Sequence, residues 1–558
     1  MIKHSTKKYL TLFAASGLSF VFGAFVWHKA EVSPFTADIV HEAQKLIGIE
    51  FTQPQTDSML TTLDYQARVY QELRGLKLAN SVVPAMNFNP VPVGFTNPDK
   101  VNGFTISKIA PVKLPADKNE LAFYTVRQLA ELIRTKQITS VELTKFFLDR
   151  LKKYDGKLLF VVSYTEEHAL KQAAQADAEI KAGKYRGVLH GIPFGVKDLL
   201  SSVDSKTTFG AAPYKDQDLG VDATVVKKLE DAGAVLIAKL SLGELAMGDT
   251  WFGGMTRNPW DITRGSSGSS AGPASSVSAG CLPFAIGSET LGSIVSPSTE
   301  CGDTGLRPSF GRVSKYGAMA LSWSMDKLGP ITRSVEDAAV VFNAIQGTDP
   351  NDLSTIAAPF KYDGNVASLK GWKIGYLKAA FENRSLNHDN DSLTLVKLKE
   401  LGAELIPIEV PKLPASSIAL VLDAEAGAAF QELVLNHKDD MLAHQGKNAW
   451  PNIFRSAQFI PAVEYINAQR ARTLLIQQWY EKIKGLDLYI APSFSSNLRL
   501  TNLTGNPCVV LPNGVNRRGL PTSITFNGQL FGEGKILEAA KIYQDATDFN
   551  KKHPTLNF

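Results

Sequence analysis

The stretch Arg264-Gly-Ser-Ser-Gly-Ser-Ser-Ala-Gly-Pro-Ala-Ser-Ser-Val-Ser-Ala-Gly280 decides how the rest of this chain is interpreted. Its composition alone would suit a flexible linker. The flanking sequences, Asn258-Pro-Trp-Asp261 and the apolar Leu282-Pro-Phe-Ala-Ile286, are instead typical of a folded body. We therefore expect an ordered loop, in which glycines let the backbone approach a reacting group and serines supply hydroxyls.

Two general patterns compete for these serines. Gly268-Ser-Ser-Ala-Gly272 satisfies GxSxG, which would make Ser270 the nucleophile of an α/β-hydrolase. That pattern requires an apolar strand before it, whereas residues 258–265 are polar and are interrupted by Pro259. A phosphate-binding loop is weaker still, because no Gly-Lys-Ser/Thr ending follows the glycines.

A more specific signal comes from three motifs that follow one another along the chain. They are Gly191-Ile-Pro-Phe-Gly-Val-Lys-Asp198, Gly268-Ser-Ser-Ala-Gly-Pro-Ala-Ser-Ser-Val-Ser-Ala-Gly280 and Gly287-Ser-Glu-Thr-Leu-Gly-Ser-Ile-Val-Ser-Pro297. Matching stretches continue at Gly305-Leu-Arg-Pro-Ser-Phe-Gly-Arg-Val-Ser314, Asp326-Lys-Leu-Gly-Pro-Ile-Thr-Arg-Ser-Val335, Leu503-Thr-Gly-Asn-Pro507 and residues 543–554. Together they resemble the amidase signature family over roughly residues 116–555.

The resemblance implies a fold and a catalytic triad. The family has a single large α/β domain, with a twisted mixed β-sheet core covered by α-helices, and uses a Ser-Ser-Lys triad on carboxamides. By resemblance, Lys197 is the base, Ser269 is a relay that follows a cis peptide bond, and Ser293 is the nucleophile. A lysine acts as a base only when it is neutral, and burial in the apolar run Ile192–Leu200 would lower its pKa from about 10.4.

The choice of Ser269 rests on register. Alignment from Asn258 without gaps places Ser269 at the position of the family's cis serine and 24 residues before Ser293, the separation that the family pattern leads us to expect. Choosing Ser266 would require a three-residue gap in the alignment with the family. Two neighbours of Ser269 have a lesser claim, namely Ser267 and Ser270.

The loop that carries Ser293 is also expected to bind the developing oxyanion. The resemblance implies that its backbone N–H groups form the oxyanion hole, those of Thr290, Leu291, Gly292 and Ser293. Many members have Asp where Glu289 stands and Gly where Leu291 stands. If position 291 needs positive φ, Leu291 would be strained by about 1–2 kcal/mol, and its side chain would also narrow the acyl pocket.

Three functions agree with this resemblance. The first is hydrolysis of a small or peptide-terminal carboxamide through an acyl-enzyme, which releases ammonia or an amine and needs no cofactor. The second is a glutaminase like the A subunit of an amidotransferase, although Val295 stands where the tRNA amidotransferase subunits commonly have arginine. The third is a binding protein that keeps the fold, which the presence of all three triad residues disfavours.

The N-terminus has the pattern of a membrane-targeting segment. An uncharged, apolar stretch over residues 9–26 follows a basic flank that contains Lys3, Lys7 and Lys8. A small-x-small cleavage site is missing, and Trp27 lies where such a site would be expected. We therefore expect residues 1–30 to be a signal peptide or a retained membrane anchor, with the rest of the chain exported to the periplasm or the extracellular space.

The remainder divides into an N-terminal extension, residues 31–115, and the amidase signature domain, residues 116–558. Capping-box patterns at Thr125 and Thr139 predict two helix starts. Short apolar runs alternate with helical stretches in the manner of an α/β fold, at residues 159–162, 235–238 and 488–491. Residues 410–470 are expected to be helical and to contribute to a substrate pocket, together with residues 247–255.

Composition excludes several other classes of protein. The 558 residues include 59 Lys plus Arg against 55 Asp plus Glu, an excess too small to suggest a nucleic-acid partner. The cysteines at 281, 301 and 508 form no CxxC pair, and no HExxH motif occurs, so we expect no metal. The expected partner is therefore a small-molecule or peptide amide substrate.

Overall fold

The computed structural model describes residues 35–203 and 205–558. Their contacts divide the chain into two compact units, with the boundary between Leu78 and Ala79. The predicted targeting segment, residues 1–30, lies outside the described residues. Within the described ranges, no helix is both long enough and apolar enough to cross a membrane.

Within its described residues, 35–78, the first unit contains two helices, α2 (Ala37–Ile47) and α3 (Gln53–Gly75). Helix α2 begins after Thr36, whose side chain accepts a hydrogen bond from the backbone of Ile39, and ends at Gly48 in the left-handed conformation. Helix α3 begins with a capping box at Thr52.

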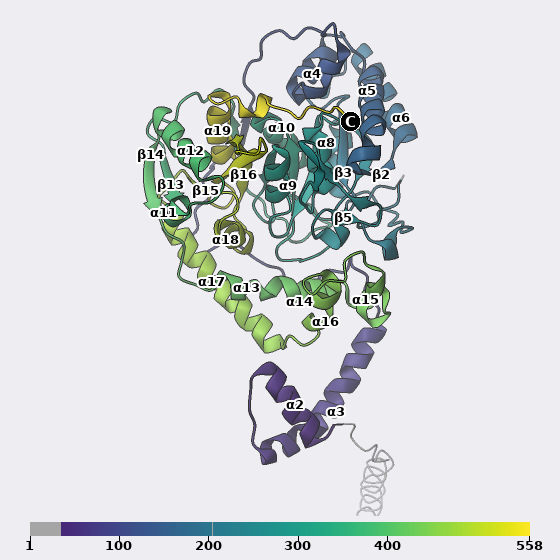
Figure 1. Cartoon of the computed structure of the whole chain (residues 1–558), viewed down its shortest axis with the longest axis vertical. Coiled ribbons are helices and arrows are strands. Elements are labelled where there is room, and N and C mark those ends of the chain that lie inside the picture. The colour runs from purple at the N-terminus through teal and green to yellow at the C-terminus, as the bar shows by residue number, and fades with distance from the viewer. Residues whose placement is uncertain (1–34, 204) are drawn as a thin grey trace, which may run out of the picture. The chain divides into compact units, whose positions relative to one another are not determined.

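The second unit is built around an eleven-stranded mixed sheet with the order β14-β13-β15-β17-β16-β10-β11-β9-β3-β4-β2 (Figure 1). The strands of this sheet are β2 (Val161–Tyr164), β3 (Pro193–Lys197), β4 (Val235–Leu240), β9 (Phe284–Glu289), β10 (Thr304–Arg307), β11 (Lys327–Thr332), β13 (Lys373–Leu377), β14 (Glu404–Ile408), β15 (Leu488–Pro492), β16 (Cys508–Val515) and β17 (Pro521–Asn527). Strands β3, β4 and β9 are parallel to one another, whereas β9, β11, β10, β16 and β17 pair antiparallel in that order. The three apolar runs predicted as strands form parts of β2, β4 and β15.

Helices cover this sheet, as the sequence predicted for an α/β fold (Figure 1). They are α4 (Val126–Arg134), α5 (Ser140–Leu158), α6 (Glu166–Lys181), α7 (Thr224–Asp231), α8 (Ala271–Ser278), α9 (Val295–Cys301), α10 (Val335–Ile345), α11 (Lys378–Glu382), α12 (His388–Glu400), α13 (Ala415–Ile418), α14 (Leu420–Ala429), α15 (Gln431–Leu435), α16 (Trp450–Ala457), α17 (Ala462–Ile483), α18 (Asn497–Thr504) and α19 (Glu533–Asp545). The predicted capping boxes at Thr125 and Thr139 are both formed. The helical character expected for residues 410–470 is confirmed by α13 to α17.

Among the described residues, three two-stranded sheets lie outside the central sheet. They are β1 (Gly103–Thr105) with β12 (Lys361–Asp363), β5 (Thr250–Trp251) with β6 (Gly254–Met255), and β7 (Arg257–Asn258) with β8 (Asp261–Gly265). The β1–β12 pair ties residues from the predicted extension to the second unit, and Asn80 does the same by a side-chain hydrogen bond to the carbonyl of Ala320. Contacts thus group residues 79–115 with the second unit. The predicted domain boundaries, 31–115 and 116–558, stay a prediction.

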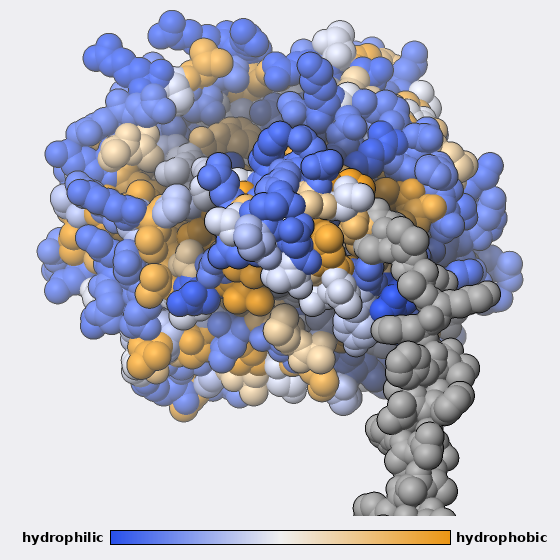
Figure 2. Space-filling model, turned by 90° about the horizontal axis from the view of Figure 1, so that it is seen from below, coloured by the Kyte–Doolittle hydropathy of each residue, from blue (hydrophilic) through white to orange (hydrophobic). Residues whose placement is uncertain are grey.

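Seen from below, the described chain presents apolar side chains among polar ones (Figure 2). On α17 and just before it, the exposed apolar residues are Phe459, Val463, Ile466 and Leu474.

The core of the second unit, by contrast, is formed by fully buried residues of the sheet and of the helices packed on it. Strands β3, β4 and β9 are buried along their whole length, so any polar side chain on them is removed from water.

Candidate active site

Lys197 is the last residue of β3 and is completely buried. Strand β3 lies between β4 and β9, and its neighbours in the chain include the buried Phe194 and Val196. The burial expected from the sequence is therefore confirmed. Because burial penalises the charged form, it lowers the pKa of the Lys197 ammonium to about 7, against the opposing effect of the Asp326 and Glu289 carboxylates.

Two hydroxyls surround the Lys197 amine. Its Nζ donates to Ser269 Oγ at 2.7 Å and to Ser288 Oγ at 2.8 Å. The contact with Ser269 joins the first two members of the expected triad. Ser288 was inside the third sequence motif but had no predicted role, because nothing in its local sequence indicates that its side chain lies opposite Lys197.

The Gly/Ser stretch is an ordered loop followed by helix α8. The peptide bond between Gly268 and Ser269 is cis, at the position that the family resemblance indicated. A Cβ at Gly268 would lie 1.8 Å from the Gly248 carbonyl oxygen, so only glycine fits there. Ser267 has positive φ, and its Oγ lies 3.1 Å from Ser296 Oγ. The packing excludes a flexible linker.

Ser293 lies in the loop between β9 and α9. It is 8% exposed, and its hydroxyl makes no hydrogen bond with any other described residue. The backbone N–H of Ser270 donates to the Ser293 carbonyl oxygen at 3.1 Å, which holds the two serine loops together. A hydroxyl that is nearly buried but unbonded beside the Lys197–Ser269 pair is suited to attack a bound carbonyl group.

The expected oxyanion loop has free donors. The backbone N–H groups of Leu291, Gly292 and Ser293 make no hydrogen bond within the described chain. Gly292 takes the positive φ in this loop, at 101°, and Leu291 has no positive φ. The strain that would follow from a left-handed Leu291 is therefore not present. Instead the Leu291 side chain is partly buried against an apolar cluster that includes Met325.

Glu289 holds the start of α9 behind this loop. Its Oε2 accepts the backbone N–H groups of Ile294 and Val295, each at 2.9 Å. Its Oε1 accepts from Arg307 and from Asn502, both at 2.7 Å. Burial alone would raise the pKa of the Glu289 carboxyl, but the charge of Arg307 and these hydrogen bonds bring it down to about 2. Glu289 is therefore a buried anion that holds the backbone at the start of α9 in place.

Asp326 holds the other side of the loop. It accepts a hydrogen bond from Thr290 Oγ1 at 2.6 Å and from the backbone N–H groups of Leu321 and Ser322 at 2.8 and 3.0 Å. Asp326 was inside a matching stretch of the sequence, but its contact with Thr290 is made across two strands of the sheet. The sequence gives no local signal for such a contact.

The competing nucleophile Ser270 has a different environment. Its Oγ donates to the Ser288 carbonyl oxygen at 3.0 Å and accepts the Ser288 N–H at 3.1 Å. It is completely buried, and the strand before it, β8, belongs to a separate hairpin. A hydroxyl engaged in two backbone hydrogen bonds is poorly placed to attack a substrate, which disfavours the GxSxG alternative.

Comparisons with known proteins agree with this geometry. The family model described as Amidase matches residues 142–498. The A subunit of glutamyl-tRNA(Gln) amidotransferase from Coxiella burnetii is 33% identical over 482 residues, which cover 77% of this chain and 99% of that protein. Its counterpart from Moorella thermoacetica is 32% identical and covers 78% and 99%.

Solved structures point the same way. The peptide amidase from Stenotrophomonas maltophilia is 29% identical, with a TM-score of 0.69, and covers 78% of this chain and 99% of that one. An amidase family protein from Bacillus anthracis is 27% identical, with a TM-score of 0.71, and covers 78% and 93%. The chain therefore belongs to the amidase family, and its Lys197–cis-Ser269 pair fits hydrolysis of a carboxamide C–N bond through a serine.

Proposed function

We propose that this protein is an amidase that hydrolyses linear carboxamides, with Ser293 as nucleophile, Ser269 as proton relay and Lys197 as base. The observation that carries the proposal is the completely buried Lys197 amine, whose Nζ lies 2.7 Å from Ser269 Oγ. With a pKa lowered to about 7 by burial, this amine is neutral in a large fraction of molecules at neutral pH and can accept a proton.

Acylation would transfer one proton along this line of groups. Ser293 Oγ attacks the amide carbon while its proton passes to Ser269 Oγ, and the Ser269 proton passes to Lys197 Nζ. The oxyanion receives hydrogen bonds from free N–H groups of the loop that begins at Thr290. When the C–N bond breaks, the leaving nitrogen takes a proton from Ser269, which Lys197 then replaces. Ammonia or an amine departs, and Ser293 remains as an ester.

Deacylation would repeat the same transfers with water. Lys197 and Ser269 remove a proton from the water as it attacks the ester carbon, and Ser293 leaves with that proton. The products of this step are a carboxylic acid and the free enzyme. Water and the amide supply all their atoms, so the proposed reaction needs no cofactor. The histidine of other serine hydrolases is replaced here by a second serine and a neutral lysine.

The alternative is a glutaminase that works within an amidotransferase complex. The identity of about one third to the A subunit of glutamyl-tRNA(Gln) amidotransferases supports it. Against it stands Val295, where that class commonly has arginine. The two functions differ in substrate: the purified chain should turn over simple carboxamides or peptide amides without any partner, whereas a glutaminase should prefer glutamine and should respond to partner subunits.

A serine-reactive fluorophosphonate tests the proposed nucleophile. The full chain is labelled, and the adduct is located by mass spectrometry. We expect label on Ser293, no label in Ser293→Ala, and undiminished label in Ser270→Ala if the latter folds, as checked by circular dichroism. An adduct on Ser270 of the wild-type chain would refute the triad and restore the GxSxG mechanism.

We also propose that the chain is exported, with residues 1–30 as a signal peptide or a retained anchor. The support is the sequence pattern alone, an uncharged stretch over residues 9–26 behind a basic flank that includes Lys7 and Lys8. Cell fractionation with N-terminal sequencing tests it. A periplasmic or membrane-bound pool is expected, and a cytosolic pool that keeps residues 1–30 would refute export.

A further inference from the structure

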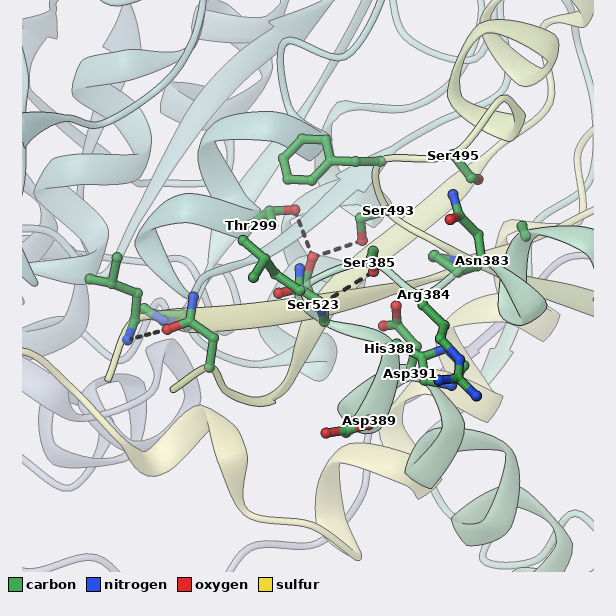
Figure 3. A pocket seen from close by; sticks show the side chains of 18 of the residues that line it. Thr299, Asn383, Arg384, Ser385, His388, Asp389, Asp391, Ser493, Ser495 and Ser523 are labelled. Carbon is green, nitrogen blue, oxygen red and sulfur yellow. Dashed lines mark hydrogen bonds between the residues drawn. The ribbon is translucent and has the colours of Figure 1, made fainter. Parts of the chain in front are cut away.

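A cavity at the C-terminal half of α9 contains none of the predicted triad residues. Its volume is about 1300 Å³, and it is formed by the C-terminal half of α9, the start of α12, the loop after β15 and the turn between β16 and β17 (Figure 3). Thr299 is the residue of α9 that joins the floor of the cavity. Helix α9 begins at Val295, two residues after Ser293, and Thr299 lies in its C-terminal half. Helix α9 therefore connects the loop that carries Ser293 to this cavity.

The floor of the cavity is a chain of buried hydroxyls. Ser523 Oγ lies 2.6 Å from Thr299 Oγ1 and 2.7 Å from Ser493 Oγ, as the dashed lines in Figure 3 show. Thr299 Oγ1 also donates to the Val295 carbonyl oxygen at 2.7 Å. All three hydroxyl residues are at most 5% exposed. The floor is polar and is held in place by its own hydrogen bonds.

Two polar atoms on the walls are buried without a partner. Ser495 Oγ and His388 Nδ1 make no hydrogen bond with the described chain, although both residues line the cavity (Figure 3). A buried polar atom that lacks a partner costs about 1–3 kcal/mol. The described chain supplies no partner for these two atoms, so a ligand or an ordered water in the cavity can bind them.

Two of the four arginine side chains that line the cavity have no carboxylate partner among the described residues. Arg264 lies 3.7 Å from Glu300, and Arg517 lies 4.0 Å from Asp389, so those carboxylates already face a guanidinium. A third carboxylate, Asp391, accepts a hydrogen bond from Asn513 at 3.0 Å, and burial raises its pKa to about 6. The two remaining arginines, Arg384 and Arg518, form no ion pair with the described chain.

We propose that this cavity binds a small organic acid with two or more carboxylates, at a site separate from Ser293. Each free guanidinium, of Arg384 and Arg518, can take one carboxylate in a two-pronged hydrogen bond. The Ser495 hydroxyl donates to the same ligand and so gains the partner that it lacks. Two guanidinium groups without an ion-pair partner favour an anion over a cation at this site.

Isothermal titration calorimetry of the full chain with citrate tests this site, with sodium chloride at matched ionic strength in the reference buffer. We expect saturable binding with one citrate per chain. The double variant Arg384→Ala/Arg518→Ala should bind citrate at least tenfold more weakly, since about a factor of ten per lost charged hydrogen-bonding group is usual. Both side chains are exposed and unpaired, so we expect the variant to fold normally.

The control is Arg470→Ala, which removes an exposed arginine of α17 that does not line the cavity. It should bind citrate like the wild type. Absence of saturable binding, or equal affinity in the double variant and the wild type, would overturn the proposal. Citrate should also leave the rate of fluorophosphonate labelling unchanged, and protection of the labelled serine by citrate would place the ligand in the active site and overturn a separate site.

Discussion

Lys197 and Lys239 are both completely buried and lie on neighbouring parallel strands, yet their surroundings differ. Lys239 Nζ lies 2.7 Å from the carboxylate of Asp198, which balances its charge. Lys197 Nζ has only hydroxyl partners, at 2.7 and 2.8 Å. Lys239 therefore forms a buried ion pair, whereas the surroundings of Lys197 favour a neutral amine. The same residue type under the same burial therefore has a charged partner in one place and, in the other, the neutral environment that the proposed proton transfer requires.

The alternation of side chains along a strand produces this difference. In the pairing of β3 with β4, Lys197 is opposite Leu240 and Val196 is opposite Lys239. Paired residues point to the same face of a sheet and successive residues to opposite faces, so the two lysines project to opposite sides. Asp198 follows Lys197 directly and projects to the side of Lys239. In the dipeptide Lys197-Asp198, the lysine side chain thus lies on one face of the sheet and the aspartate side chain on the other.

Replacement of the active-site lysine should have the largest effect. Lys197→Met keeps the length and the apolar stem but removes the base, so we expect kcat/KM for a carboxamide to fall by about 10⁴-fold. The variant should unfold at a higher temperature at pH 7, because it no longer buries an amine that the unfolded chain would protonate. This gain should be largest below pH 7 and should shrink towards pH 10, since the folded pKa is about 7 and the unfolded one about 10.4. Retained turnover would refute the role of Lys197.

Replacement of the ion-paired lysine should act on stability. Lys239→Met leaves the Asp198 carboxylate buried without its cation, and we expect a loss of about 3–5 kcal/mol in the free energy of unfolding, measured with urea. Folded molecules should keep most of their activity. The double variant Lys239→Met/Asp198→Asn, which removes both charges, should recover part of the lost stability. A stable but inactive Lys239→Met would contradict the distinction between the two lysines.

The pH dependence of activity should report the neutral lysine. Burial lowers the pKa of Lys197 to about 7, so the fraction of active, neutral amine rises with pH. We expect kcat/KM to reach a plateau above about pH 8. One pH unit below the pKa of Lys197, kcat/KM should be about tenfold lower than this plateau. A profile that stays flat from pH 6 to pH 9 would show that no group with this pKa takes part. Ionic strength should have little effect, because the amine is shielded from solvent.

The smallest effect is expected from the second hydroxyl partner. Ser288→Ala removes one acceptor of the Lys197 amine, which destabilises the protonated form more than the neutral one. We expect kcat/KM to fall by less than about tenfold and its pH midpoint to move to lower pH. Ser278→Ala, which removes a buried hydroxyl bonded to the Cys301 carbonyl, is the matched control. An equal shift of the midpoint in both variants would contradict a specific role for Ser288.

Much of the site was predictable because its parts lie in short motifs. Lys197 and Ser293 were assigned as catalytic candidates from stretches of eleven residues or fewer, and the register of the Gly/Ser loop pointed to Ser269, which follows a cis peptide bond. The positions of Ser288 and Asp326 were also inside such stretches. Their contacts were not predictable, because Ser288 reaches Lys197 across 91 residues of chain and Asp326 reaches Thr290 across 36.

The sequence by itself determined the family, the α/β fold, the capped helix starts and the residue types needed to cleave an amide, since each of these depends on neighbours within a few positions. Only the tertiary structure decided which buried lysine has a carboxylate partner, which serine hydroxyls are bonded and which is free, and that Gly292 rather than Leu291 takes the positive φ. These properties depend on the pairing of strands β3, β4 and β9. Burial and partner distance arise only when segments far apart in the chain pack together, and they set the proton affinity of an amine.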